Sequence, residues 1–552
     1  MSKGRLRIPG KLGAVVCATW VIAALIVGLL TFIVSSRRAN LTWDDADYLR
    51  RALTNTRVST SAEGFGVVTR SLRCLLRERP KPPCLVAWIQ IGTVAFDRQH
   101  LDALILFSSV LPYSILLATV VFLGRRLAGP WGGLGALTCL VASPLSLAFG
   151  GKVMVETLLS LWVLIIYALT CRLLVHPSRK LGMAIGILVG LAFLTKLTIV
   201  LFLPIPLYFA LARVIRGGRE RAILLKSLVW SVVACAAIAG PWYVSNANTA
   251  YKFAQFSSRY NEIAELRPDR DPTWRRLVLM AADLPGWPLA ATFGIAAVLV
   301  ALVARSRTPT ADSLADEALR DDRGALFSRM AWLGAGSAAT ILLWPLYFDT
   351  RFLMPIWPVV AVDLGRRLAV ILPRSRRPQR VTFAAGLAIS VICAAIAVVR
   401  APVVPTYWNT AALIDNLVHE YGTATIGNVG NFAEWNVSKS GLANELRRQP
   451  ATCFVLHDLT KMLADEAQRR LPRFDAVIVL GEGNLSETRL MSSPGLNRSY
   501  RLISRILAED PTFARISTAP IDGLPALSVY VRKALVVRRE ETSRPSHERR
   551  RL

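Results

Sequence analysis

The sequence has few charged residues and few cysteines for its length. Charged side chains account for 19% of its 552 residues, and hydrophobic ones for 53%. A chain this apolar is not intrinsically disordered, because it can bury enough surface to offset the entropy lost on ordering. Its eight cysteines are too few for a disulfide-dense secreted scaffold. The apolar residues therefore belong to a folded core or to a membrane.

The sequence also lacks the short motifs that mark nucleotide and metal sites. It has no Gly-x-x-x-x-Gly-Lys-Ser/Thr loop, and no Gly-x-Gly-x-x-Gly follows a predicted strand. It has neither Cys-x-x-Cys nor His-Glu-x-x-His, and its five histidines are scattered. We therefore predict no nucleotide site, no tightly held metal and no cofactor, although the sequence leaves a divalent metal requirement open.

Long apolar runs are what the sequence has in abundance. A bilayer span requires roughly 18 to 25 mainly apolar residues, and about eleven runs approach or reach that length. We predict an α-helical polytopic membrane protein with about eleven transmembrane helices and a C-terminal extracytoplasmic α/β domain. The runs lie at 12–34, 103–123, 131–149, 153–175, 181–195, 197–212, 222–242, 286–304, 328–346, 352–372 and 381–399.

The first apolar run, 12–34, has two interpretations. A cleaved signal peptide has an apolar region of only about 7–15 residues, followed by a small-residue cleavage site. This run is longer and is followed by Arg37-Arg38, so we predict an uncleaved anchor with its N-terminus in the cytoplasm. The basic residues that precede it are Lys3, Arg5, Arg7 and Lys11.

The net charge of +29 is compatible with nucleic acid, an anionic membrane surface or an anionic substrate. Most basic residues fall in the loops on the predicted cytoplasmic side, while the short outer loops carry few. This is the positive-inside asymmetry, so we predict no nucleic-acid partner. An odd number of spans places the C-terminal part outside the cytoplasm. Arginine outnumbers lysine 55 to 11, which hints at a GC-rich bacterial genome and a bacterial plasma (inner) membrane.

The chain divides into three predicted parts. Residues 1–399 form a transmembrane domain, whose large outer loop at 35–102 follows the first span. Residues 400–535 have no further span and alternate strand-like with helix-like runs, which predicts an extracytoplasmic α/β domain. Residues 536–552 are basic and polar, which predicts a disordered tail. The strand-like runs lie at 424–429, 452–457, 475–480, 514–517 and 527–531; candidate interfacial helices lie at 45–53 and 85–96.

Ionisable residues beside a span indicate function, because charges near the apolar phase are costly. The first such group is the segment 42–49 (TWDDADYL), directly after the first span. It can be an ordinary helix start, with Thr42 as N-cap and acids in the first turn. It can also supply a general base, since neighbouring acids and a low dielectric raise the pKa of a carboxylate. Asp44 and Asp45 are therefore candidate catalytic residues.

Two further groups contain a lysine. Lys81 precedes Pro-Pro-Cys, which is either a stiff entry to an interfacial helix or a means of holding the lysine near a lipid phosphate. Lys152 and Glu156 follow a Gly-Gly pair at the turn between the third and fourth spans. They can form an ordinary i,i+4 ion pair. Alternatively, Glu156 is a further catalytic acid and Lys152 binds substrate.

Cations and aromatic residues also gather at the predicted outer ends of the spans. Snorkelling of long side chains and the aromatic belt of membrane proteins explain each of them separately. Because they share one side of the membrane, we also consider them as substrate-binding residues. They are Lys196 in GLAFLTK (190–196), Trp242 and Tyr243 in PWY (241–243), and Arg351 in YFDTRF (347–352).

Cys74 and Cys84 both lie in the large outer loop. An oxidising compartment would allow them to form a disulfide. The alternative is two free thiols, since the bond requires a specific geometry that the sequence does not reveal.

The order of these groups is more specific than any one of them. It resembles the polytopic C-type glycosyltransferases that include the protein O-mannosyltransferases (PMT-like proteins) and lipid A aminoarabinose transferase. The segment 44–48 is similar to that family's acidic motif, and Lys81-Pro-Pro to its Lys-Pro-Pro-Leu element. The resemblance covers about residues 1–375, and its other elements are the turn 143–156, GLAFLTK (190–196), PWY (241–243) and RFLMP (351–355).

The sequence departs from the family pattern at three positions. Asp45 stands where the family has glutamate, Cys84 where it has leucine, and Phe352 where tyrosine is common. These differences concern the placement of the substrate rather than the family as a whole.

The resemblance implies transfer of a sugar from a polyprenyl-phosphate donor to an acceptor hydroxyl or phosphate at the outer membrane face. The acceptor would be a glycolipid, a polysaccharide or a protein, and membrane lipids are the other expected partner. Lys81, Lys196 and Arg351 would stabilise charge on the leaving phosphate. Asp44 would act as general base in a single displacement that inverts the anomeric carbon. A glycosidase would instead require two carboxylates across the scissile bond.

Three other classes of membrane protein are weighed against the pattern. A transporter or flippase of lipid-linked glycans would show inverted repeats, and no internal symmetry is visible. A polymerase or ligase of envelope polysaccharides also has many spans, but usually lacks the Asp-Asp motif followed by Lys-Pro-Pro. A sensor that binds a ligand through its outer domain would not need these acids and cations.

Overall fold

The computed structural model describes a defined set of residues. They are 10–36, 43–61, 65–77, 81–96, 100–217, 220–259, 291, 322–343, 350–374, 388–389, 391–393, 395–396, 407–423, 425–429, 452–455, 469, 471–480, 503, 505–516 and 527–543. The predicted span 286–304 lies almost entirely outside this set, and the predicted span 381–399 lies largely outside it.

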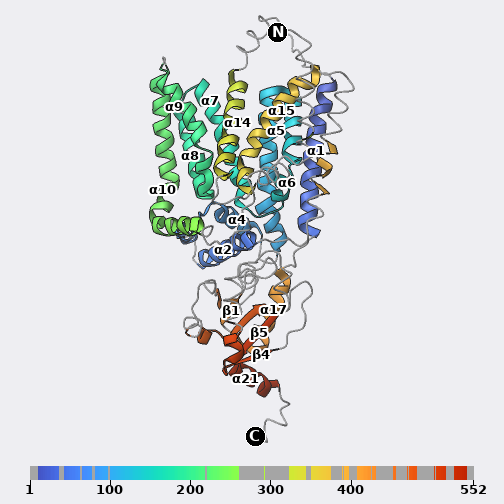
Figure 1. Cartoon of the computed structure of the whole chain (residues 1–552), viewed down its shortest axis with the longest axis vertical. Helices are drawn as coiled ribbons and strands as arrows, with labels where there is room; N and C mark the ends of the chain where they lie inside the picture. Colours follow the sequence, from blue (N-terminus) through green and yellow to red (C-terminus); the bar gives the residue numbers. More distant parts are fainter. Residues whose placement is uncertain are drawn as a thin grey trace, which may run out of the picture.

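Most of the described chain forms a bundle of long helices that lie side by side (Figure 1). Among the described residues, four helices are long and apolar enough to cross a membrane: Val15–Val34, Leu101–Val141, Val155–Val175 and Arg221–Lys252. The protein is therefore a multi-pass membrane protein, as predicted, although these helices do not establish the predicted count of spans. The bundle contains α1 (Gly10–Ser36), α5 (Leu101–Val141), α7 (Val155–Val175), α8 (Arg179–Thr195), α9 (Pro204–Ile215), α10 (Arg221–Arg259), α14 (Asp322–Leu343) and α15 (Trp357–Arg374).

The helix α5 is a hairpin of two arms. Its backbone leaves the helical region at Ala128 (φ −146°, ψ 22°) and Gly129 (φ 72°, ψ −168°). The arms then meet closely, since a Cβ on Gly124 would lie 2.6 Å from the carbonyl oxygen of Gly132. Glycine adopts a positive φ without steric cost, so Gly129 allows this reversal. The two arms correspond to the predicted spans 103–123 and 131–149, the second continued by α6 (Pro144–Gly150).

Three helices of the first outer loop lie outside the bundle: α2 (Trp43–Thr60), α3 (Phe65–Leu76) and α4 (Cys84–Ala95). Figure 1 places α2 and α4 across the end of the bundle that faces away from the N-terminus. The hydroxyls of Thr56 and Thr93 join α2 to α4 at 2.7 Å. The Asn246 amide on α10 donates to the Leu76 carbonyl oxygen at the end of α3, also at 2.7 Å. The candidate interfacial segments are thus helical, and α3 is an additional helix.

Small residues allow α8 and α10 to approach each other closely. A Cβ on Gly182 or Gly186 would lie 2.2 Å from the carbonyl oxygen of Ser227 or Ser231, respectively. The Ser231 hydroxyl donates to the Gly182 carbonyl oxygen at 2.6 Å. Lipid offers no hydrophobic force between helices, so close backbone contact and hydrogen bonds of this kind hold them together. This contact fixes α8, whose outer end leads to Lys196.

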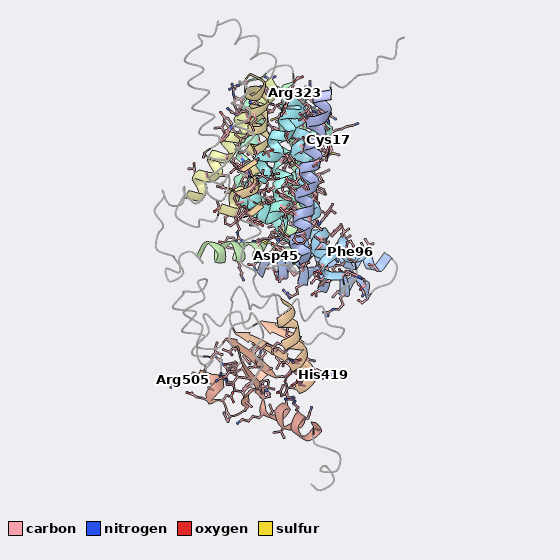
Figure 2. The ribbon with its side chains drawn as sticks, turned by 90° about the vertical axis from the view of Figure 1, so that its right-hand side faces the viewer. Cys17, Asp45, Phe96, Arg323, His419 and Arg505 are labelled. Carbon is pink, nitrogen blue, oxygen red and sulfur yellow. The ribbon has the colours of Figure 1, made fainter. Side chains whose placement is uncertain are left out.

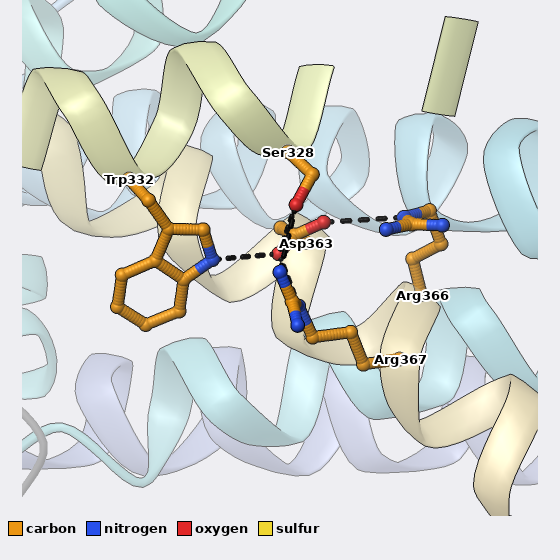
Figure 3. Close-up of polar contacts among 5 residues, drawn as sticks. All are labelled: Ser328, Trp332, Asp363, Arg366 and Arg367. Carbon is orange, nitrogen blue, oxygen red and sulfur yellow. Dashed lines mark hydrogen bonds and ion pairs between the residues drawn. The ribbon is translucent and has the colours of Figure 1, made fainter. Parts of the chain in front are cut away.

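A buried acid joins α14 to α15 (Figure 3). Asp363 on α15 is fully buried. Its Oδ2 accepts from Arg367 Nε at 2.7 Å, from the Trp332 indole at 2.8 Å and from the Ser328 hydroxyl at 3.1 Å. Its Oδ1 accepts from Arg366 Nε at 3.1 Å. Both oxygens are thus paired, as a buried charge requires, and α15 is held in one position relative to α14.

The described part of the C-terminal region forms a five-stranded sheet beyond α2 and α4 (Figures 1 and 2). The strand order is β2-β1-β3-β5-β4; β1 pairs in parallel with β2 and β3, and β5 pairs antiparallel with β3 and β4. The helix α17 (Tyr407–Tyr421) packs against it through Leu413, Ile414 and Leu417. The strands are β1 (Thr425–Val429), β2 (Thr452–Val455), β3 (Ala476–Leu480), β4 (Phe513–Ile516) and β5 (Leu527–Arg532).

The prediction of a disordered tail from residue 536 is corrected for its first part. The helix α21 (Lys533–Ser543) continues into that segment. Leu535 and Val536 pack against the core of the sheet domain, and Arg539 forms an ion pair with Glu420 at 2.8 Å. These contacts stabilise a helix that the basic composition alone does not indicate.

We expect Asp363→Ala to destabilise the bundle strongly. The change removes the carboxylate that Arg366 and Arg367 share, and breaking a buried ion pair costs about 3–5 kcal/mol. Thermal unfolding of the purified protein in detergent should therefore occur at a lower temperature. The matched control is Glu509→Ala, which removes an exposed i,i+4 partner of Arg505 and should change little. Equal unfolding temperatures for Asp363→Ala and wild type would contradict the role of Asp363.

Candidate active site

The predicted acidic segment forms the first turns of α2. The backbone begins its helix at Trp43, so position 44 shares a helical face with Asp47 and Tyr48. The side chain of Asp44 lies outside the described residues. Asp45 is buried, with 1% of its surface exposed, and Figure 2 labels it at the end of the bundle nearest the C-terminal domain. Both candidate acids thus lie where α2 meets the bundle.

Asp47 is surrounded by three cations. Arg51 Nε lies 2.9 Å from its Oδ2, Lys81 Nζ lies 3.6 Å from the same oxygen, and Arg50 Nη2 lies 3.1 Å from its Oδ1. Burial alone would raise the pKa of Asp47, but the positive charges of Arg51, Lys81 and Arg50 hold that pKa below its ordinary value of 3.8. Asp47 is therefore a permanent carboxylate that anchors these cations.

Lys81 also contacts the Tyr48 ring, and Cys84, three residues later in the chain, contacts α8. Its ammonium is 4.8 Å from the centre of the Tyr48 ring, a cation–π contact. Cys84 begins α4 after the two prolines, and its thiol is in hydrogen-bonding contact with the side chain of Thr195 at the end of α8. Because Thr195 directly precedes Lys196, this contact brings the Lys81 and Lys196 segments together.

Glu156 and Lys196 form a short ion pair. Lys196 Nζ donates to Glu156 Oε1 at 2.6 Å, and the Glu156 side chain is only 1% exposed. Glu156 stands in the first turn of α7, where the helix dipole stabilises a carboxylate. Its other oxygen, Oε2, is buried and has no hydrogen-bond partner among the described residues. The alternative i,i+4 pair with Lys152 is not formed, because α7 begins at Val155 and Lys152 precedes it.

Phe352 lies between two of the predicted substrate-binding cations. Lys196 Nζ is 4.6 Å from the centre of its ring, and the guanidinium carbon of Arg351 is 5.3 Å away. Both Arg351 and Phe352 belong to η4 (Thr350–Ile356), which leads into α15. The Ser160 hydroxyl ties η4 to α7, since it donates to the Glu156 carbonyl oxygen at 2.7 Å and to that of Met354 at 3.3 Å. Segments far apart in sequence thus meet around Lys196.

Three other candidates, Trp242, Tyr243 and Lys152, make their described contacts with neighbouring side chains and backbone of the protein. Trp242 is 2% exposed, and its ring packs edge-on against Tyr243 at 4.8 Å. The Tyr243 hydroxyl donates to the Phe193 carbonyl oxygen at 3.1 Å, which braces the outer end of α8. Lys152 Nζ lies 5.4 Å from the centre of the Phe149 ring.

Cys74 and Cys84 are free thiols in the structure, so it does not contain the disulfide that the sequence allowed. Cys74 belongs to α3, whereas the thiol of Cys84 faces Thr195 on α8. The Cys84 thiol therefore contacts Thr195 on α8 and not Cys74 on α3.

Several residues of this region were not predicted as site residues. Asp47, Arg50 and Arg51 follow an i, i+3, i+4 pattern, which is the signal that indicates an acid with two cations on one helical face. Asp363, which joins α14 to α15 away from this region, has the same pattern with Arg366 and Arg367. Among the described residues, no group of three or more histidine, cysteine, aspartate or glutamate side chains is arranged to hold a metal ion.

The comparisons with known proteins concern the family and the fold. Residues 80–243 match the family model of dolichyl-phosphate-mannose-protein mannosyltransferases. The structure is similar to ArnT from Cupriavidus metallidurans bound to undecaprenyl phosphate, with a TM-score of 0.57 and 14% identity, over 93% of this chain and 98% of ArnT. The apo state of that ArnT gives a TM-score of 0.55 at 14% identity over the same shares of the two chains.

A more distant similarity links the chain to the Archaeoglobus fulgidus oligosaccharyltransferase in its apo form. The TM-score is 0.47 with 15% identity, over 84% of this chain and 69% of that protein. No curated protein matches the sequence. The resemblance inferred from the motifs is confirmed: the chain has an ArnT-like fold, and residues 80–243 match the mannosyltransferase family model.

The lowered pKa of Asp47 predicts how pH affects stability. Its ordinary pKa is 3.8 and its folded pKa is lower, so its contribution to stability is complete well above 3.8 and is lost as pH falls through the folded value. The difference in unfolding temperature between wild type and Asp47→Asn should therefore be constant near neutral pH and shrink in acid. A difference that grows in acid would contradict the lowered pKa.

The Glu156–Lys196 pair predicts strong coupling. Either Glu156→Gln or Lys196→Met alone leaves a charged partner uncompensated, with a cost of about 3 kcal/mol. The double variant should lose clearly less stability than the sum of the two single variants. Unfolding measurements on the three variants test this, and additive losses would mean that the two groups do not interact.

Proposed function

We propose that the protein is a membrane glycosyltransferase that moves a sugar from a polyprenyl-phosphate donor to an acceptor hydroxyl or phosphate. The observation that supports this most is the gathering of Lys81, Lys196 and Arg351 beside buried acids, on segments linked by the Cys84–Thr195 contact. The match to the mannosyltransferase family model and the similarity to an ArnT bound to undecaprenyl phosphate support the same donor class.

The cations suit departure of a lipid phosphate. A phosphate leaving group is a weak base, so it needs positive charge rather than a proton donor as the glycosidic bond breaks. Cations fixed in a site of low dielectric stabilise this developing charge without reorganising during the reaction. In our proposal Lys81, Lys196 and Arg351 have this role, and Asp47 positions Lys81 for it.

An acceptor hydroxyl requires a general base, a role that we assign to Asp44. Attack by the acceptor from the face opposite the lipid phosphate inverts the anomeric carbon in a single displacement. We assign Asp45 to orienting Asp44 or the sugar. Glu156 keeps Lys196 in place through Oε1, while its buried Oε2 is free to accept a hydrogen bond from the acceptor. Trp242 and Tyr243 brace the end of α8, and we assign Lys152 to substrate contact at the rim.

The location follows from the topology predicted from the sequence. We propose a bacterial plasma (inner) membrane, a cytoplasmic N-terminus and an active site on the outer face. The domain division at about residue 399, with the C-terminal α/β domain extracytoplasmic and α21 part of that domain, belongs to this proposal. An outward site sees no nucleotide-sugar pool, which agrees with the lack of nucleotide motifs in the sequence. The acceptor is a glycolipid, a polysaccharide or a protein.

Asp44→Asn should abolish transfer while leaving expression and membrane insertion unchanged. The amide keeps the size of the side chain but cannot accept the acceptor proton. Mass spectrometry of envelope material from a deletion strain should first identify the one missing sugar, and complementation with the variant should fail to restore it. The matched control is Asp102→Asn in the first turn of α5, which should restore the sugar fully. Full restoration by Asp44→Asn would remove Asp44 as the base.

A further inference from the structure

The helix α3 presents an apolar stripe that no described part of the chain covers. Val68, Leu72 and Leu76 are 51%, 57% and 40% exposed, respectively. Their spacing of four residues places them on one side of the helix. Exposed apolar side chains are normal when scattered, whereas a continuous stripe on a helix indicates a binding surface. The stripe therefore calls for an apolar partner outside the chain.

Three arginines flank this stripe. Arg70, Arg73 and Arg77 are all exposed and share another side of α3, on which Arg73 lies nearest to Leu72 and Leu76. The segment 65–77 contains no aspartate or glutamate. A basic face beside an apolar face is the pattern of helices that lie in the surface of a membrane, with cations at the lipid phosphates.

The remaining side of α3 is fixed to the protein. Leu75 packs against the core of the bundle, and the Asn246 amide of α10 holds the Leu76 carbonyl oxygen at 2.7 Å. On the same helix as Asn246, Val244 is 82% exposed. The stripe on α3 therefore lies beside an exposed apolar part of a helix that is long and apolar enough to cross a membrane. Lipid is the occupant that we assign to it.

We propose that α3 is a binding surface for anionic phospholipids of the outer leaflet. The apolar stripe enters the acyl region, and Arg70, Arg73 and Arg77 bind the headgroup phosphates. This inference depends on the membrane embedding of the chain and not on glycosyl transfer, so its failure and the failure of the proposed function are independent of each other.

Hydrogen exchange of the full-length protein in lipid nanodiscs tests this surface. Amides of residues 65–77 should exchange more slowly in discs with equal parts phosphatidylcholine and phosphatidylglycerol than in phosphatidylcholine alone. Each arginine near an anionic surface should contribute about fivefold to this slowing. Arg70→Gln/Arg73→Gln/Arg77→Gln should exchange like wild type in phosphatidylcholine and gain little protection from phosphatidylglycerol.

Two further variants show whether the slowing depends on the arginines of α3 itself. Arg125→Gln/Arg126→Gln removes exposed cations at the turn of α5, opposite the outer end, and should leave the response of residues 65–77 unchanged. Arg73→Gln alone should reduce the response by about fivefold, which covers the case that the triple variant does not fold. Identical exchange of wild-type α3 in the two lipids would overturn the proposal, and so would equal protection by inorganic phosphate in neutral discs.

Discussion

The ion pair between Glu156 and Lys196 is the interaction around which the candidate site is organised. The Glu156 side chain is buried and that of Lys196 is mostly buried, so each charge is stabilised mainly by the other. Their 2.6 Å contact fixes the start of α7 against the end of α8. Lys196 in turn meets the Phe352 ring on η4, which brings Arg351 to the same place. Three segments of the chain are thereby positioned by one pair of opposite charges.

The same physical rule accounts for the other buried acids. Asp47 forms ion pairs with Arg50, Arg51 and Lys81, and Asp363 forms ion pairs with Arg366 and Arg367. In both cases two of the cations follow the acid by three and four residues on one helix, so local geometry supplies the first partners at little entropic cost. The third partner of Asp47 comes from another segment and joins α2 to the entrance of α4. The acids thus satisfy their own charge and connect elements at the same time.

The parts of the fold that were predictable depend on local patterns. Apolar run length identified the four described helices that are long and apolar enough to cross a membrane. It also separated the two arms of α5, which reverse at Ala128 and Gly129. The order of short motifs indicated the family before any contact was known. The partner of Glu156 was not predictable, because Lys152 is near in sequence while Lys196 is forty positions away and meets it only in three dimensions. The strand order β2-β1-β3-β5-β4 is equally non-local, since several orders fit the same alternating pattern.

The two lysines of the candidate site each contact a carboxylate and an aromatic ring. Lys81 lies between a carboxylate and the Tyr48 ring, and Lys196 lies between a carboxylate and the Phe352 ring. Each lysine therefore has lost most of its rotamer freedom during folding, at the cost of one buried acid. In the proposed function, a lipid phosphate would meet charges already in position, so its binding energy would not be consumed in ordering them. The buried acids thus lower the net positive potential of the site, but they hold the two lysine ammonium groups in position.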